Sequence, residues 1–425
     1  GYLGFLRDSP SAAQRLCHVL SNSRFLGDAL NKSVESVTWL GNDDSLQPRS
    51  RESLDIQTKA TLERNAGNIN DFANSIRAMR RHEIERIGLA WMSGVIDDEA
   101  SLAGMTDVYD AAIEASLQWA IQHRINDIQI DEAPAAIAII GMGRYGGREV
   151  NFSSDADVII IYRPAEGADD DQANLFARKV QEDLRAILQG PTTFEPKIEL
   201  DMDLRPEGKN GPLVRSYASC EEYYRSWAST WEHQALLRAR YAAGDASLAE
   251  DFLMNIADPL RYPKIDLTET QIAEIRKLKA RMEAERLPRG VRRDRHLKLG
   301  KGGLSDVEWT IQLLQLQHAG DNANLRVNGT LQALNELEHR KLISAGDAVV
   351  LRKAWRMCTA ARNGSYLWSG RVNQADILPD DSYSLGGIAV YLGYDANRGQ
   401  HFENDLLAVI RKARDVTERL FYGRS

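Results

Sequence analysis

Cysteine is scarce in this chain of 425 residues, and long hydrophobic runs are absent. The three cysteines, Cys17, Cys220 and Cys358, lie far apart and form no C-x-x-C pair. Without such pairs the sequence predicts neither a disulfide framework nor a zinc site. No window approaches the roughly 18 uncharged apolar residues that a membrane-spanning helix needs, so we expect no membrane partner.

An excess of basic residues is also missing. The formal net charge is −8 and the sequence pI is about 5.6, whereas proteins that coat nucleic acid usually carry a clear basic excess. We therefore expect no nucleic-acid partner. The chain also lacks a charged segment followed by an apolar leader, so we predict a cytoplasmic protein. Because it begins with Gly1 rather than Met, we interpret it as part of a longer protein.

Hydrophobic periodicity divides the chain into three regions. Helical spacing of apolar residues dominates residues 1–130 and returns over 261–425, where it predicts a helical bundle. Residues 131–260 instead show short runs of strand-like composition around one helix. We therefore expect a mostly helical α+β protein with a small mixed sheet. The predicted strands cover 135–140, 158–162 and 198–204, and the helix between the last two covers 172–188.

Two local patterns carry further expectations. The helix predicted over 71–95 contains four arginines, which we interpret as a solvent-exposed face; they are Arg77, Arg80, Arg81 and Arg86. In a later helix over 304–318, the spacing Ser305-x-x-Glu308 predicts a capping box at the helix start.

A glycine motif follows the first predicted strand. Gly141-Met-Gly143-Arg-Tyr-Gly146 spells G-x-G-x-x-G, the fingerprint of dinucleotide-binding domains. Only residues 148–154 separate Gly147 from the next strand, which is too short for a crossover helix. The acids also stand at the start of that strand rather than at its end. These two mismatches argue against a nicotinamide site, and the short link favours an antiparallel or otherwise local pairing of the two strands.

Carboxylates gather around the second predicted strand. Asp155 and Asp157 project from one face because side chains alternate along a strand, and such neighbours repel each other unless a cation lies between them. A second run alternates Glu199, Asp201, Asp203 and Arg205 with apolar residues. If this second run pairs beside the strand of Asp155 and Asp157, it adds a third carboxylate to the site. Alternation alone does not identify which acid that is. The same pairing would bring Arg205 to phosphate oxygens.

The oxygen ligands and small residues near these acids indicate phosphate chemistry. Carboxylates suit Mg²⁺, with Mn²⁺ an equal possibility. Gly146 and Gly147, with Ser153 and Ser154, would let backbone and hydroxyl donors approach a triphosphate such as ATP. The set predicts two-metal phosphoryl transfer. Lys298, in a glycine-rich loop before the helix at 304, is either an ATP phosphate contact or part of a packing turn.

Four longer strings narrow the prediction to one family. They are "GMGRYGGREVNFSSDADVIIIY", "LDMDLRPEGKNGPLVRS", "YYRSWASTWEHQALLRARYAAGD" and "HLKLGKGGLSDVEWTIQLLQLQHA". In this order they resemble the bacterial bifunctional glutamine synthetase adenylyltransferases/adenylyl-removing enzymes, of the polymerase-β type nucleotidyltransferase superfamily. The resemblance implies a nucleotidyltransferase core flanked by an N-terminal helical region and a C-terminal bundle. It also implies Asp155, Asp157 and Asp201 as metal ligands, Asp201 as the group that helps to deprotonate the attacking hydroxyl, and Gly146 and Gly147 in the phosphate loop.

Enzymes of this family have two homologous halves, one that removes AMP by phosphorolysis and one that attaches it. "TWEHQALLRAR" resembles the carboxy-terminal transferring half, whereas "LRPEGKNGPLV" also occurs in removing halves. The resemblance thus implies transfer of AMP from ATP to a tyrosine of glutamine synthetase, with removal as the alternative. A more distant alternative is a nucleotidyltransferase that modifies a small molecule. A PII-type signal protein is the regulatory partner that the family implies.

Overall fold

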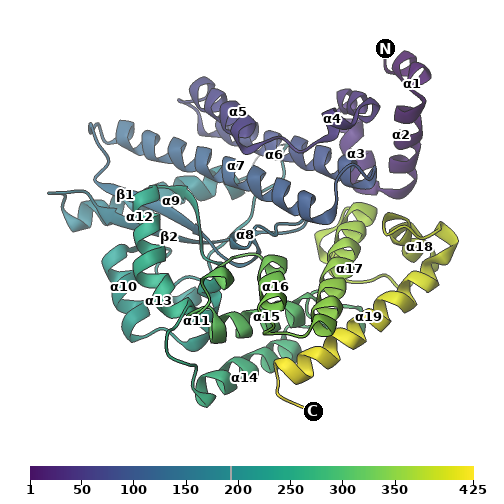
Figure 1. The fold of residues 1–425 in the computed structure, drawn as a ribbon. Coiled ribbons are helices and arrows are strands. Elements are labelled where there is room, and N and C mark those ends of the chain that lie inside the picture. The colour runs from purple at the N-terminus through teal and green to yellow at the C-terminus, as the bar shows by residue number, and fades with distance from the viewer. Residues whose placement is uncertain (192–193) are drawn as a thin grey trace.

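The computed structural model describes residues 1–191 and 194–425 and shows helices packed around a small mixed sheet (Figure 1). The expected mostly helical α+β class is confirmed. Among the described residues, no helix combines the length and apolar composition needed to cross a membrane. The N-terminal helices are α1 (Tyr2–Asp8), α2 (Pro10–Asn22), α3 (Arg24–Lys32), the 3-10 helix η1 (Val34–Gly41), α4 (Asp43–Leu46), α5 (Arg51–Arg64), α6 (Ile69–Met92) and α7 (Asp98–Asp127).

The sheet is built on two antiparallel strands, as the short link between them predicts. Residues of β1 (Ala135–Gly141) pair with β2 (Ala156–Pro164), and β5 (Arg240–Gly244) adds an antiparallel neighbour to β1. Parallel to β2 run β3 (Leu200–Asp201) and β4 (Val214–Ser216). The strand predicted over 198–204 is thus too long, because the chain turns after Asp201. The sequence patterns did not predict β4 or β5.

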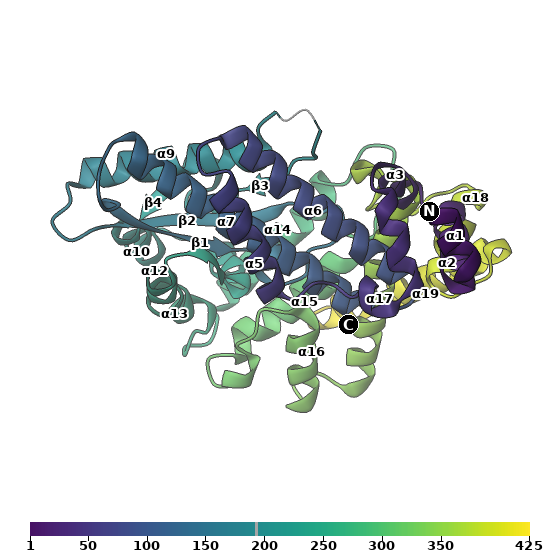
Figure 2. The same ribbon diagram turned by 90° about the horizontal axis from the view of Figure 1, so that it is seen from above.

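Helices cover both faces of this sheet. On one face α7 and α9 (Asp170–Gln189) pack on alternate residues such as Ile139 and Ile160, and Figure 2 shows α6 and α7 lying across the strands. The N-terminal helices and this face share one hydrophobic core. The other face, with Ile140 and Ile159, packs against a second set of helices: α10 (Tyr217–Ser226), α11 (Thr230–Ala235), α12 (Ala246–Asp251), a π-helix (Phe252–Ala257) and α13 (Asp258–Arg261).

The C-terminal helices form a largely separate core. They are α14 (Glu269–Glu285), α15 (Leu304–His318), α16 (Thr330–His339), α17 (Ala345–Ser369), α18 (Ser382–Tyr391) and α19 (Gly399–Leu420). The α17 helix packs against α3, so that the N-terminal helices and the C-terminal helices lie side by side at one end of the molecule (Figures 1 and 2).

The predicted capping box at the start of α15 is wrong. The helix begins at Leu304 with Gly303 as its N-cap, which places Ser305 inside the first turn. The buried Asp306 next to it accepts hydrogen bonds from Gly302 N (2.6 Å) and from Lys279, and Arg414 lies 3.1 Å away. The polar residues of this turn thus tie α14, α15 and α19 together.

The arginines of α6 do not form a solvent-exposed face. Arg77 is 1% exposed, and its guanidinium donates hydrogen bonds to the carbonyls of Gly190, Glu195 and Pro196 at 2.7, 2.8 and 3.0 Å. Arg81 forms an ion pair with Glu195 (2.8 Å), and Arg86 lies over the Trp39 ring. Arg77 and Arg81 thus hold residues of the link from α9 to β3. Helical spacing alone does not show this because their acceptors lie more than a hundred residues away in the sequence.

Replacing Arg77 should therefore destabilise the fold. Because Arg77→Met leaves three carbonyls without their donor, we expect the free energy of unfolding to fall by about 2–4 kcal/mol. Arg178→Met, at an exposed position on α9, is the matched control and should change it by less than about 0.5 kcal/mol. Urea unfolding of both variants measures the difference, and equal midpoints would contradict the structural role of Arg77.

Candidate functional site

Three carboxylates meet where β2 and β3 begin to pair. Asp155 and Asp157 lie at the start of β2, and the parallel register places Asp201 directly beside Asp157. One oxygen from each of the three side chains lies within 4.8 Å of the other two. Local pairing of two strands thus produces a compact cluster of hard oxygen ligands, and it selects Asp201 from the three acids that alternation left open.

The electrostatics of this cluster favour binding of a cation. Burial raises the pKa of Asp157 to about 8, and the neighbouring Asp155 and Asp201 raise it further. Burial and Asp201 also raise the pKa of Asp155. Carboxylates in this arrangement favour a divalent cation of the Mg²⁺ or Mn²⁺ kind, whose preferred ligands are oxygens.

The turn after β1 lies directly against the cluster. There α8 (Gly143–Gly146) begins with Gly143 at φ 53°, and a Cβ on Gly143 would lie 2.3 Å from Asp157 Oδ2. The backbone N–H of Met142 donates to the carbonyl of Asp157 (2.8 Å). Gly143 is therefore the glycine that makes room for the carboxylate. The sequence interpretation missed this role, although the residue stands in the motif that it discussed.

Gly146 and Gly147 pack against other parts of the chain. A Cβ on Gly146 would lie 2.0 Å from the carbonyl oxygen of Arg238, and one on Gly147 would lie 2.6 Å from the Arg238 guanidinium and 3.2 Å from Asn328 O. Because these two glycines have no side chains, Arg238 and Asn328 can pack closely against them. The sequence had instead predicted that a triphosphate would approach at this position.

The two serines and Arg205 hold loops in place. Asn151 Oδ1 accepts hydrogen bonds from both Ser153 Oγ (3.3 Å) and Ser154 Oγ (2.5 Å). Arg205 is buried, and its guanidinium donates to the carbonyls of Met202, Lys209 and Gly211 at 2.8 to 3.0 Å. With these donors engaged inside its own loop, Arg205 does not fit the predicted contact with phosphate oxygens.

Lys298 approaches the carboxylates from the C-terminal helices. Its ammonium group is close enough to lower the pKa of both Asp155 and Asp157, and burial together with Arg144 and Arg362 lowers the pKa of Lys298 itself. Among the described residues its side chain has no hydrogen bond or ion pair. A nearly buried cation without such a partner is suited to bind an anionic group of a ligand.

Two ion pairs surround Lys298. Arg144 of α8 lies 2.7 Å from Glu308 of α15, and the buried Arg362 of α17 pairs with Asp376 at 2.5 Å. The first pair connects the turn after β1 to the C-terminal helices, which the capping interpretation of Glu308 did not foresee. The sequence did not indicate either ion pair, because the two residues of each pair belong to separate elements.

The arrangement offers carboxylates for a divalent cation and a lysine for an anion, which is the chemistry of an enzyme that acts on phosphorylated substrates. A family model described as Glutamate-ammonia ligase adenylyltransferase matches residues 13–255. The chain belongs to this enzyme family. A second family model, described as GlnD PII-uridylyltransferase, matches residues 275–421.

Individual relatives agree with the family. The chain is similar to proteins named bifunctional glutamine synthetase adenylyltransferase/adenylyl-removing enzyme from Bifidobacterium longum (78% identity over all of this chain), Leifsonia xyli subsp. xyli (43% identity over 99% of it) and Mycobacterium avium (40% identity over 99% of it). It spans 40%, 40% and 42% of their respective lengths.

A side chain at position 143 should disturb the carboxylate cluster. Gly143→Ala places a methyl group against Asp157, so we expect the rise in thermal midpoint on adding Mn²⁺ or Mg²⁺ to be lost. Gly167→Ala is the matched control, because Gly167 also has positive φ (76°) but no atom within 4 Å of its would-be Cβ. Thermal unfolding with and without the ions measures both, and a wild-type rise in Gly143→Ala would refute this placement of Asp157.

The raised pKa of Asp157 predicts a pH-dependent cost to stability. The folded protein holds this proton up to about pH 8, whereas the unfolded chain releases it near pH 4. Stability should therefore fall as pH rises between these values in the absence of divalent ions, because the unfolded state then binds fewer protons. Asp157→Asn removes the charge, so its thermal midpoint in EDTA should exceed that of the wild type increasingly toward about pH 9.

The difference between the two proteins isolates this residue, since other groups with raised pKa values, such as Glu85 and Asp98, are unchanged in the variant. Parallel midpoints across the pH range would show that Asp157 is not strained by its neighbours.

Proposed function

We propose that this chain transfers AMP from ATP to a tyrosine hydroxyl of glutamine synthetase and releases pyrophosphate, on a nucleotidyltransferase core of the polymerase-β type. The observation that carries the proposal is the cluster of Asp155, Asp157 and Asp201 facing the unpaired Lys298. Membership of the adenylyltransferase family and the printed name of the relatives support it.

The three aspartates would hold the divalent ions, Mg²⁺ or Mn²⁺. When bound, such ions neutralise charge on the reacting phosphate and on the leaving pyrophosphate. Asp201 lies at the end of a two-residue strand and is partly exposed, so an incoming tyrosine could reach it. Its carboxylate would accept the hydroxyl proton. Gly143 keeps space beside Asp157, which maintains the orientation of that ligand.

Lys298 would bind the phosphates from the opposite side. Its charge lowers the pKa of both Asp155 and Asp157, so the negative triphosphate would lie between the lysine and the ions held by the carboxylates. The Arg144–Glu308 ion pair (2.7 Å) fixes the distance between these two sides.

Removal of AMP by phosphorolysis is the second candidate. The relatives' name includes both activities, and the chain spans 40% of the first of them, so either half of the enzyme is compatible with the match. The same carboxylates and lysine would serve an attack by inorganic phosphate on the adenylyl group. The match of residues 275–421 to the GlnD PII-uridylyltransferase model supports a PII-type protein as a regulatory partner of the longer enzyme.

Intact-mass measurement of glutamine synthetase subunits tests the reaction and its direction. One reaction contains this chain, ATP and Mg²⁺, and the other contains adenylylated subunits with phosphate. We expect subunits in the first reaction to gain one AMP. Loss of AMP in the second, with ADP formed, would support the removing activity, and no change in either would overturn the proposal.

The same assay tests Lys298. Lys298→Met should lower the rate of AMP transfer by about a hundredfold, because a preorganised charge on the phosphates is lost. Lys301→Met, three residues along the same loop and exposed, is the matched control and should retain the rate. Similar rates in the two variants would assign Lys298 to packing.

A further inference from the structure

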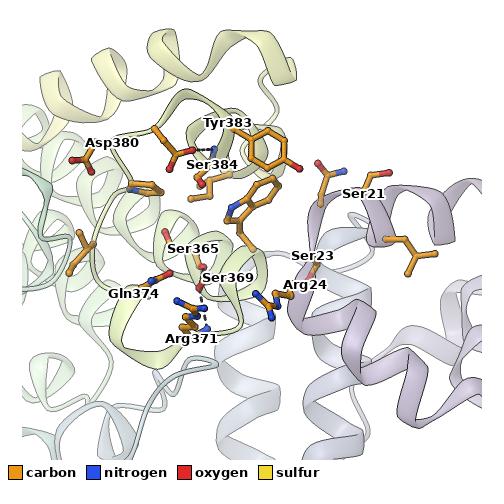
Figure 3. Close-up of a pocket in the computed structure, with 17 residues that line it drawn as sticks. Ser21, Ser23, Arg24, Ser365, Ser369, Arg371, Gln374, Asp380, Tyr383 and Ser384 are labelled. Carbon is orange, nitrogen blue, oxygen red and sulfur yellow. Dashed lines mark hydrogen bonds between the residues drawn. The ribbon is translucent and has the colours of Figure 1, made fainter.

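A second cavity lies between the N-terminal and C-terminal helices, away from the carboxylates. It has a volume of about 680 Å³ and is bounded by the α2–α3 junction on one side and by α17, α18 and the segment between them on the other (Figure 3). Small-molecule sites commonly fall in this size range. None of the carboxylate-site residues lines it.

Two arginines from separate parts of the chain face this cavity. Arg24 begins α3, and Arg371 follows the end of α17; Figure 3 shows both on the same side of the cavity, with Tyr383 across from them. Among the described residues neither guanidinium has an ion pair or a hydrogen bond. Arginines gathered without a carboxylate partner form a favourable position for an anion, which they can bind with planar, paired hydrogen bonds.

The opposite wall is aromatic and preformed. The Trp368 indole packs directly on Gly387, where a Cβ would lie 2.0 Å from the ring. Its ring centroid lies 5.1 Å from that of Tyr383, with an angle of 64° between the two ring planes. This packing fixes the indole in place. Tyr383 is 78% exposed at the cavity wall. Such surfaces suit a planar ring, which stacks on aromatic side chains.

A buried polar atom in the lining also has no partner. Ser365 is 3% exposed, and its Oγ makes no hydrogen bond, although its carbonyl accepts one from Ser369 Oγ (3.0 Å). The acid at the start of α18 is already engaged, since Asp381 accepts a hydrogen bond from Ser384 N (2.7 Å). Asp380 adds a second carboxylate to the lining. In Figure 3 it lies away from the two arginines, so the cavity keeps an unused hydroxyl and, on the side of those arginines, two cations without a partner among the described residues.

We propose that this cavity is a binding site for a small anion that carries a planar ring, the chemistry of a nucleoside phosphate. The phosphate lies between Arg24 and Arg371, and the ring packs against Trp368 and Tyr383. This site is separate from the carboxylate cluster, so it stands whether or not the transfer reaction is confirmed.

The cavity wall continues into the loop that carries Lys298. Ile377 lines the cavity and pairs with His296 as an isolated β-bridge. On either side of that bridge, Leu297 N donates to Asp376 O and Leu378 N donates to Arg295 O, both at 2.8 Å. A bound anion therefore has a direct physical connection to the loop beside the carboxylates.

Isothermal titration calorimetry with ADP in EDTA tests the site on the whole chain, because removing divalent ions weakens nucleotide binding at the carboxylates. We expect saturable binding that Arg371→Glu weakens by about tenfold or more, as charge-assisted hydrogen bonds of this kind contribute. Arg411→Glu, at an exposed position of α19, makes the same charge change elsewhere and should bind as the wild type does. Lys298→Met should also retain binding.

Three results would overturn the proposal: no saturable binding of ADP, equal affinity in Arg371→Glu, or loss of binding in Lys298→Met, which would place ADP at the carboxylate site. Inorganic pyrophosphate as the probe tests the ring separately. Pyrophosphate should bind at least about tenfold more weakly than ADP, since it has no ring to stack on the aromatic wall. Equal affinity of the two would show that the site does not recognise the ring.

Discussion

Mutual repulsion among three neighbouring carboxylates, of which two are half-buried and one is exposed, is the constraint around which the rest of the structure is arranged. One oxygen of each of Asp155, Asp157 and Asp201 lies within 4.8 Å of the other two because β2 pairs with β3, and burial together with the two neighbouring charges raises the pKa of Asp157. Burial of apolar side chains in the interior of the sheet offsets the free-energy cost of holding these carboxylates together. Val158 and the residues up to Tyr162 are buried between helices on both faces, and each such side chain contributes roughly 1.5–3 kcal/mol. A well-packed strand thus holds in place a site that would separate by itself.

The part of this arrangement that follows from local rules could be predicted from the sequence. A link too short for a helix predicts the antiparallel β1–β2 pair, and alternation places Asp155 and Asp157 on one face. The third acid required the register of β3, which alternation does not contain; the family resemblance named Asp201, and the pairing of β3 places it in the cluster. The helices predicted over 71–95, 172–188 and 304–318 have nearly correct ends, whereas α7 was not separately predicted. The strands β4 and β5, of three and five residues, are too short for a periodic pattern.

Tertiary contacts explain what the sequence could not show. Arg77 resembles a solvent-exposed residue by spacing but binds carbonyls of a distant loop. Gly146 and Gly147 resemble a phosphate loop but accommodate Arg238 and Asn328, while Gly143 makes room for Asp157. Glu308 resembles a capping acid but pairs with Arg144. In each case the partner lies many residues away, so the residue type and its neighbours in the chain carry no information about the contact.

The position of Lys298 has a consequence for the order in which the protein becomes complete during synthesis. The three aspartates belong to the stretch that ends at residue 201, and the lysine beside them is added to the chain about a hundred residues later. The helix that holds the lysine loop, α15, follows later still, and its partner α19 is the last element of this chain. A ribosome-bound chain that has folded its sheet therefore displays the acids without the opposing cation. Such a chain lacks the ammonium group that binds the phosphates in the proposed reaction.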